Sequence, residues 1–250
     1  MAKDNDIREK YELLRSSVYR PYSLKGYDHF KYRIDEALKD ISPVGMSILD
    51  VGCGIGHLTT YLALMGADKI VGLEPMLSGS ADNSFLIFKR SIEELELSNC
   101  VAINGTFQEF NSKPHEFDIL ISYNSINHLD DDRCRKLHYD SESWGHYLGM
   151  MKKAYTMLNS RGVFVIADCS RTNIYSKLGK LGIKNPFMSD INWEIHQHPR
   201  TWKLLLKEAG FTRIRYWWNT PYQLRGIKFL LSNRFFSYLT TSNFVIHAFV

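Results

Sequence analysis

Cysteine is scarce in this chain of 250 residues, and long apolar runs are missing. The four cysteines are far apart and include no C-x-x-C pair: Cys53, Cys100, Cys134 and Cys169. Zinc sites and disulfide frameworks need closer or better-paired cysteines, so the sequence predicts no metal site and four buried, reduced thiols. No apolar run approaches the roughly eighteen residues of a membrane span. The N-terminal MAKDNDIREK lacks the apolar core of a secretory signal, so we expect a cytoplasmic protein.

Concentrated basic charge is also lacking. The formal net charge is +4, and lysines and arginines form no run longer than a pair. Because nucleic-acid-binding proteins usually gather basic charge on one face or tail, a polynucleotide substrate is disfavoured, although an RNA substrate stays an alternative. With 44% hydrophobic and 23% charged residues, and no repeats or low-complexity linkers, the composition is typical of one globular domain with a full core.

The most informative segment reads ILDVGCGIGHL and spans Ile48–Leu58. Its β-forming residues run into Asp50, and glycines recur at Gly52, Gly54 and Gly56 before an amphipathic stretch begins. This pattern predicts a buried strand that turns tightly into a helix, with glycines where a ligand approaches the backbone. Glu74 ends the next short apolar run, where nucleoside-binding α/β folds place their ribose-hydroxyl acceptor. We therefore predict an adenosine-containing cofactor.

The glycine spacing helps to identify that cofactor. Dinucleotide-binding loops follow G-x-G-x-x-G, whereas the glycines here alternate strictly and Asp50 precedes the first by two residues. A carboxylate in the pocket would repel a pyrophosphate but could accept hydrogen bonds from an ammonium group. S-adenosylmethionine has an amino group and no phosphate. An NAD(P)-dependent oxidoreductase and a non-catalytic Rossmann-like binding module remain the alternatives.

These residues resemble the class I, Rossmann-like, S-adenosylmethionine-dependent methyltransferases, whose first motif reads LDVGCGxG, as Leu49–Gly56 does. The resemblance continues in LNSRGVFVIAD at Leu158–Asp168 and HPRTWKLLLKEAGF at His198–Phe211. It implies S-adenosylmethionine as cofactor and an α/β fold. The sheet should be seven-stranded, mostly parallel and doubly wound, in the order 3-2-1-4-5-7-6, with helices on both faces and an antiparallel hairpin near the C-terminus.

Short apolar runs that alternate with helical patterns support that fold class. We predict strands at Ser47–Val51, Lys69–Glu74, Cys100–Asn104, Phe117–Tyr123, Gly162–Asp168, Phe211–Trp218 and Asn243–Val250. We predict helices at His57–Met65, Ser84–Leu97, His146–Leu158 and Pro199–Ala209. Residues 1–44 are expected to add a helical cap over the cofactor pocket, and residues 45–250 to form the methyltransferase domain, with a lid insertion at about 169–198.

The resemblance also implies the residues that bind the cofactor. Glu74 would accept both ribose hydroxyls, and Met76 would lie against the adenine. The acid that relatives often place after the third strand is missing here, where the chain reads Gly105-Thr106-Phe107. The predicted cofactor-binding residues are Asp50, Gly52, Cys53, Gly54, Gly56, Glu74, Pro75, Met76, Thr106, Phe107, Asn124 and Ser125.

Methyl transfer mainly requires alignment of donor and acceptor, and a hydroxyl acceptor must also lose a proton. Histidine suits that role near neutral pH. His128 matches a histidine of the family's small-molecule branch, and His196 lies in the expected lid, so both are candidates for the base. We read the acids of HLDDDR as a helix start rather than a metal site. The predicted function is O-methylation of a small acceptor, a sugar or specialised metabolite.

The segment Ile227–Phe244 is rich in phenylalanine and contains interleaved cations. We interpret it as a helix packed between the last two strands. The alternatives are an apolar wall of the substrate site and a surface that contacts lipid. The sequence does not indicate an oligomeric state.

Overall fold

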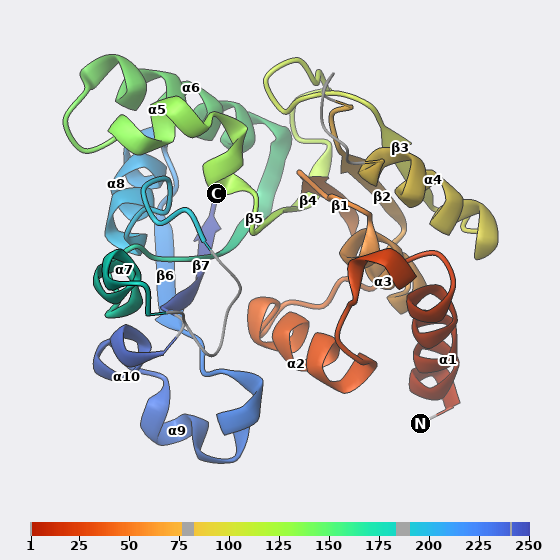
Figure 1. The fold of residues 1–250 in the computed structure, drawn as a ribbon. Helices are drawn as coiled ribbons and strands as arrows, with labels where there is room; N and C mark the ends of the chain where they lie inside the picture. The colour runs from red at the N-terminus through yellow and green to blue at the C-terminus, as the bar shows by residue number, and fades with distance from the viewer. Residues whose placement is uncertain (1, 77–82, 184–190, 241) are drawn as a thin grey trace.

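The structure is a computed structural model that describes residues 2–76, 83–183, 191–240 and 242–250. A seven-stranded sheet runs through it in the order β3-β2-β1-β4-β5-β7-β6 (Figure 1). The first five strands in this order are mutually parallel, whereas β7 is antiparallel to both β5 and β6. The sheet is therefore mixed, in the predicted strand order and with the predicted hairpin at its edge.

The strands are the short apolar runs of the sequence. Four of the five residues of β1 and of β2 are buried, as expected for strands covered on both faces. Strand β5 begins earlier than predicted. The strands are β1 Ser47–Val51, β2 Lys69–Leu73, β3 Cys100–Ile103, β4 Phe117–Tyr123, β5 Leu158–Cys169, β6 Arg213–Trp218 and β7 Asn243–Phe249.

Capping residues set the helix boundaries. Helix α8 has the predicted bounds, with Pro199 in its first turn and Gly210 in the left-handed conformation after its end. Helix α6 begins at Ser141, before the predicted His146, because the carboxylate of Asp140 accepts the backbone N–H of Ser143 as an N-cap. The α-helices are α1 Ala2–Ser16, α2 Tyr27–Ala37, α3 His57–Met65, α4 Ser84–Glu94, α5 Asp131–Lys136, α6 Ser141–Met157, α7 Tyr175–Leu178, α8 Pro199–Ala209, α9 Lys228–Leu231 and α10 Arg234–Leu239. The 3-10 helices are η1 Arg20–Tyr22, η2 Ile126–Leu129, η3 Gly179–Leu181 and η4 Tyr222–Ile227.

Two apolar cores lie on opposite faces of the sheet (Figure 1). One core joins the sheet to α6 and α8 through side chains such as Met151 and Trp202. The other joins it to α2, α3 and α4 through side chains such as Phe30, Leu62 and Phe88. Because each face is covered, the carboxyl ends of the parallel strands remain the place for a ligand.

The N-terminal helices are attached to α3 by aromatic contacts. The rings of Tyr11 and Phe30 stack with centroids 4.8 Å apart, and Phe30 meets Tyr61 of α3 edge-on at 5.1 Å. The division into a cap and a methyltransferase domain stays a prediction, and residues 184–190 of the expected lid lie outside the described residues.

The cysteines conform to the sequence prediction, since all four are buried and free. Among the described residues, no helix combines the length and apolarity needed to cross a membrane.

Candidate active site

The candidate site forms where neighbouring parallel strands end. Gly52 follows β1, Glu74 follows β2, Asn124 follows β4, and Asp168 lies near the end of β5. Strands β1 and β4 are adjacent in the sheet, although the chain leaves β1 toward β2 on the other side. Such a switch point opens a crevice beyond the strand ends, and open α/β sheets bind their ligands there.

The glycine loop wraps around this crevice in left-handed backbone conformations. Gly52 and Gly54 have φ angles of +69° and +57°. A Cβ atom on Gly52 would lie 2.7 Å from Cβ of Ser125, so a larger residue does not fit there. A Cβ on Gly54 would meet no protein atom within 4 Å, and the Gly54 N–H donates to Oε2 of Glu74 at 2.8 Å. The loop thus keeps backbone open to a ligand and holds Glu74 beside it.

A first cavity of about 400 Å³ opens at this loop. Nine predicted site residues line it: Gly52, Gly54, Glu74, Pro75, Thr106, Phe107, Asn124, Ser125 and His128. The set of predicted cofactor-binding residues did not include Leu73, Gly105, Gln108 and Leu129, which also line it. All four adjoin predicted residues along the chain, so proximity in sequence was the signal that could have identified them.

The remaining four predicted cofactor residues, Asp50, Cys53, Gly56 and Met76, do not line this cavity as described. Asp50 is buried behind the loop, where its carboxylate accepts the hydroxyl of Thr59 at 2.7 Å instead of facing a ligand. Burial raises the pKa of Asp50 to about 7, and the charge of Glu74 acts in the same direction. Its position indicates a role in shaping the loop.

The lining of the first cavity suits S-adenosylmethionine. Glu74 provides a carboxylate for a cis-diol, Phe107 an apolar surface, and Gly54 an open backbone. Among the described residues that line this cavity, none is lysine or arginine, so a pyrophosphate would find no cation there. The residues that line the first cavity therefore suit a nucleoside that carries no phosphate groups.

A second cavity, of about 480 Å³, lies next to the first and shares Asn124 and His128 with it. Its walls come from the ends of β4 and β5, from α2, and from the segment that leads into η4. Its lining is largely polar: Lys25, His29, Tyr32, Arg33, Glu36, Tyr123, Asn124, His128, Ala167, Asp168, Cys169, Ile191, His196, Asn219, Thr220, Pro221, Tyr222, Gln223, Asn243 and Phe244. Helix α2, which we expected over the cofactor pocket, thus lines the adjoining cavity.

Asn124 stands at the junction of the two cavities in a strained conformation. Its φ angle is +56°, a region that asparagine tolerates better than most residues. The Asn124 N–H donates to the carbonyl of Ala167 at 2.7 Å, which fixes the turn after β4 against β5. Backbone strain of this kind is often found at functional sites.

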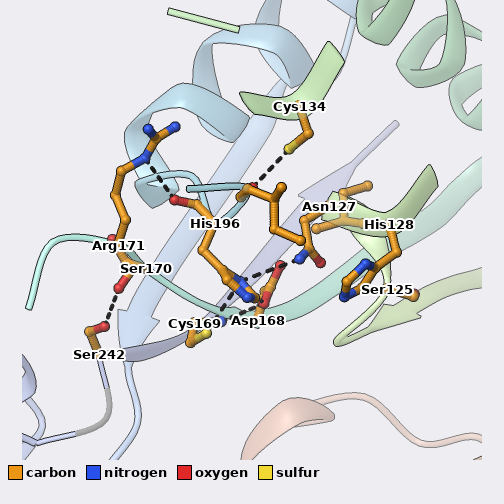
Figure 2. A network of polar contacts seen from close by, with 12 residues as sticks. Ser125, Asn127, His128, Cys134, Asp168, Cys169, Ser170, Arg171, His196 and Ser242 are labelled. Atoms are coloured by element: carbon orange, nitrogen blue, oxygen red, sulfur yellow. Dashed lines mark hydrogen bonds and ion pairs between the residues drawn. The ribbon is translucent and has the colours of Figure 1, made fainter. Parts of the chain in front are cut away.

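His196 lies in a buried polar network (Figure 2). Its Nδ1 is 3.1 Å from Oδ1 of Asp168 and 3.3 Å from Sγ of Cys169. The amide of Asn127 approaches the same nitrogen at 3.4 Å. Oδ1 of Asp168 also accepts the backbone N–H of Cys169 at 2.6 Å. Because a carboxylate can only accept, we assign a hydrogen to the Nδ1 that faces it. Nε2 is then the ring nitrogen that can accept a proton.

The backbone around His196 is held on both sides. The guanidinium Nε of Arg171 donates to the carbonyl of His196 at 2.9 Å, and the thiol of Cys134 donates to that of Ile195 at 3.0 Å (Figure 2). The side-chain amide of Gln197 donates to the carbonyl of Cys134. These hydrogen bonds hold the backbone on either side of His196, whose side chain lines the second cavity.

His128, the other candidate base, is in a more open setting. Its side chain is 54% exposed, and its Nδ1 is 3.0 Å from Oδ1 of Asp131. The rings of His128 and His196 have centroids 6.4 Å apart. Both predicted histidines therefore flank the place where the cavities meet, and each is paired with a carboxylate.

Asp168, Cys169 and His196 offer potential ligand atoms that all lie within 4.8 Å of one another. In the described structure these atoms contact one another. Burial, together with the charge of Asp168, raises the pKa of the Cys169 thiol well above its usual range. The expectation that the protein holds no metal stays a prediction.

The comparisons with known proteins agree with this geometry. Residues 27–216 match the methyltransferase domain family. The chain is 27% identical over 138 residues to the mitochondrial ubiquinone biosynthesis O-methyltransferase of Dictyostelium discoideum, a match that spans 52% of the chain and 38% of that relative. A second ubiquinone biosynthesis O-methyltransferase, from Azorhizobium caulinodans, is 26% identical over 51% of the chain and 42% of its own length. The chain thus matches about two fifths of each of these two relatives.

A solved S-adenosylmethionine-dependent methyltransferase from Aquifex aeolicus superposes with a TM-score of 0.58 at 14% identity, covering 98% of this chain and 97% of that one. At this identity the likeness shows the fold alone. The family match covers most of the chain, so the chain belongs to the methyltransferase domain family, within the class I Rossmann-like type. Its cofactor is S-adenosylmethionine, and the nicotinamide-dependent alternative is therefore set aside.

Proposed function

We propose that this protein transfers a methyl group from S-adenosylmethionine to a hydroxyl of a small acceptor, a sugar or a specialised metabolite. The observation that carries the proposal is the contact between the two cavities. The first suits the donor, the second has polar walls, and Asn124 and His128 belong to both. The names of the two O-methyltransferase relatives support oxygen as the methylated atom.

His196 is the base in this proposal. When bound, S-adenosylmethionine supplies an electrophilic methyl carbon attached to a sulfonium. The acceptor hydroxyl loses its proton as its oxygen forms the new bond to carbon, and Nε2 of His196 takes that proton. Asp168 then stabilises the imidazolium through Nδ1, at 3.1 Å, in a site with little exposure to water. His128 is mostly exposed, which suits alignment of the acceptor at the junction better than proton removal.

The test compares histidine variants in an assay of S-adenosylhomocysteine release, with a panel of phenols and sugars as acceptors. His196→Ala should lower kcat by about a hundredfold or more, because general-base catalysis is lost. Its affinity for S-adenosylhomocysteine should not change, because His196 does not line the first cavity. Asp168→Asn should lower kcat and alter its pH dependence, while the exposed His138→Ala serves as the matched control.

Two results would contradict the proposal. Full turnover by His196→Ala, together with loss of turnover in His128→Ala, would assign the base to His128. Tight binding of S-adenosylhomocysteine without turnover of any acceptor in the panel would favour the non-catalytic binding module.

A further inference from the structure

Helices α9 and α10 carry an exposed apolar surface that methyl transfer does not explain. Phe229 is 80% exposed and Phe235 is 67% exposed, although both are large apolar side chains. Six such residues form what we call the α9–α10 patch: Ile227, Phe229, Leu230, Phe235, Phe236 and Leu239. The interpretation of this segment as a helix packed between the last two strands is therefore wrong. In Figure 1, both helices lie at the lower left, away from the body of the sheet.

The stretch of sequence that contains the patch carries charge of one sign. From Ala209 to Val250 the chain contains no aspartate or glutamate, whereas it contains five cations: Arg213, Arg215, Arg225, Lys228 and Arg234. Arg213 and Arg215 lie over the ring of Phe249 on the sheet, which leaves three cations in and beside the patch. Lys228 pairs with Glu36 at 2.7 Å. Among the described residues, no carboxylate lies within ion-pair distance of Arg225 or Arg234.

We propose that the α9–α10 patch docks this protein onto an anionic lipid surface. Phenylalanine and leucine side chains that project between cations are the combination by which peripheral proteins enter the headgroup region. Anionic lipids supply the negative charge that this part of the chain lacks. Two copies of the chain that met through this patch would bring like charges together. An anionic lipid surface therefore complements the charge of the patch better than a second copy does.

The patch is also connected to the second cavity. Thr220 and Pro221, just before η4, and Tyr222 and Gln223, the first two residues of η4, line that cavity, and α9 follows η4 directly. The hydroxyls of Thr220 and Ser232 are 3.0 Å apart, and Glu36, the partner of Lys228, lines the same cavity. A lipid surface in contact with the patch would therefore lie beside the cavity that we assign to the acceptor. The docking proposal itself does not depend on the proposed methyl transfer.

The experiment is vesicle flotation of the full chain. The vesicles are made of phosphatidylcholine alone or of an equimolar mixture of phosphatidylcholine and phosphatidylglycerol. We expect the wild type to float with the mixed vesicles, and to do so less at high salt because the cations are then screened. Phe229→Ser with Phe235→Ser should lower the partition coefficient by about tenfold or more, because two inserted rings are lost. Arg225→Gln with Arg234→Gln should remove the preference for anionic vesicles.

Leu86→Ser is the matched control, since Leu86 is 49% exposed on α4, far from α9 and α10 in Figure 1. The substituted side chains are exposed, so all variants should keep the thermal unfolding midpoint of the wild type. Equal flotation of the wild type and the Phe229/Phe235 variant, or no flotation with either vesicle, would overturn the proposal. Concentration-dependent self-association in light scattering without vesicles, abolished in the Phe229/Phe235 variant, would assign the patch to a second copy and would also overturn it.

Discussion

Single residues in this site divide into those that face a ligand and those that shape the backbone around it. Glu74 and Asn124 line a cavity, whereas Asp50 lies behind the glycine loop and bonds to Thr59. Sequence spacing places these residues at the same edge of the sheet but does not indicate which way a carboxylate points. The burial of Asp50 has a measurable consequence for stability.

The pH dependence of stability should differ between the wild type and Asp50→Asn. The pKa of Asp50 is raised to about 7 in the folded state, above the value of about 3.9 in an unfolded chain. Between these values the folded state holds a proton that the unfolded state releases, so this group lowers stability as the pH rises. Asparagine does not titrate and still accepts from Thr59.

The free energy of unfolding of Asp50→Asn relative to the wild type should therefore increase by about 3 kcal/mol from pH 4 to pH 7. Urea unfolding at several pH values measures it, with the exposed Asp68→Asn as control. Parallel curves for Asp50→Asn and the wild type would show that Asp50 is already ionised in the folded protein.

Sequence reasoning named more of the residues that line the first cavity than of those that line the second. The glycines, Glu74 and Asn124 follow a strand in a recognisable motif, so the strand ends locate them. Arg33 and Tyr222 come from α2 and η4, which are distant in sequence from the motif and reach the second cavity only through tertiary packing. Asp168 closes a predicted strand, and an acid at that position was the available signal for a partner of His196.

At the scale of elements, the strands and helix α8 could be predicted because their signals are local. Short apolar runs between helical patterns identified the strands, and Pro199 and Gly210 marked the two ends of α8. The early start of α6 depended on an N-cap bond of Asp140 that the apolar periodicity does not reveal. The exposure of α9 and α10 was left open as an alternative, and the sequence could not select it, because apolar residues are interpreted as core unless their partner is known.

Two glycine substitutions should have opposite effects on stability. Gly210 ends α8 with a φ angle of +114°, so Gly210→Ala should destabilise the protein by about 1 kcal/mol or more. Gly149 lies inside α6, where a Cβ would meet no neighbouring atom, so Gly149→Ala should stabilise it by about 0.5–1 kcal/mol. Thermal or urea unfolding of the two variants measures both effects, and a change of the same sign in both would contradict the helix boundaries described here.

At the scale of the whole molecule, the fold brings the proposed donor cavity, the proposed acceptor cavity and the proposed lipid contact together. The glycine loop opens the first cavity, and α2 and η4 line the second. The α9–α10 patch continues directly from η4, which lines the second cavity through Tyr222 and Gln223. The cavities have a common wall at Asn124 and His128, which is where the two reactants of the proposed methyl transfer would meet.

The central claim, that the first cavity binds the methyl donor through the glycine loop and Glu74, is tested most directly by calorimetric titration with S-adenosylhomocysteine. We expect one site per chain in the wild type and no binding of NAD. Glu74→Ala should weaken the affinity by about tenfold to a hundredfold, because a charge-assisted hydrogen bond is lost. The exposed Glu93→Ala should bind as the wild type does. Equal affinity in Glu74→Ala and the wild type, or no binding in either, would contradict the account.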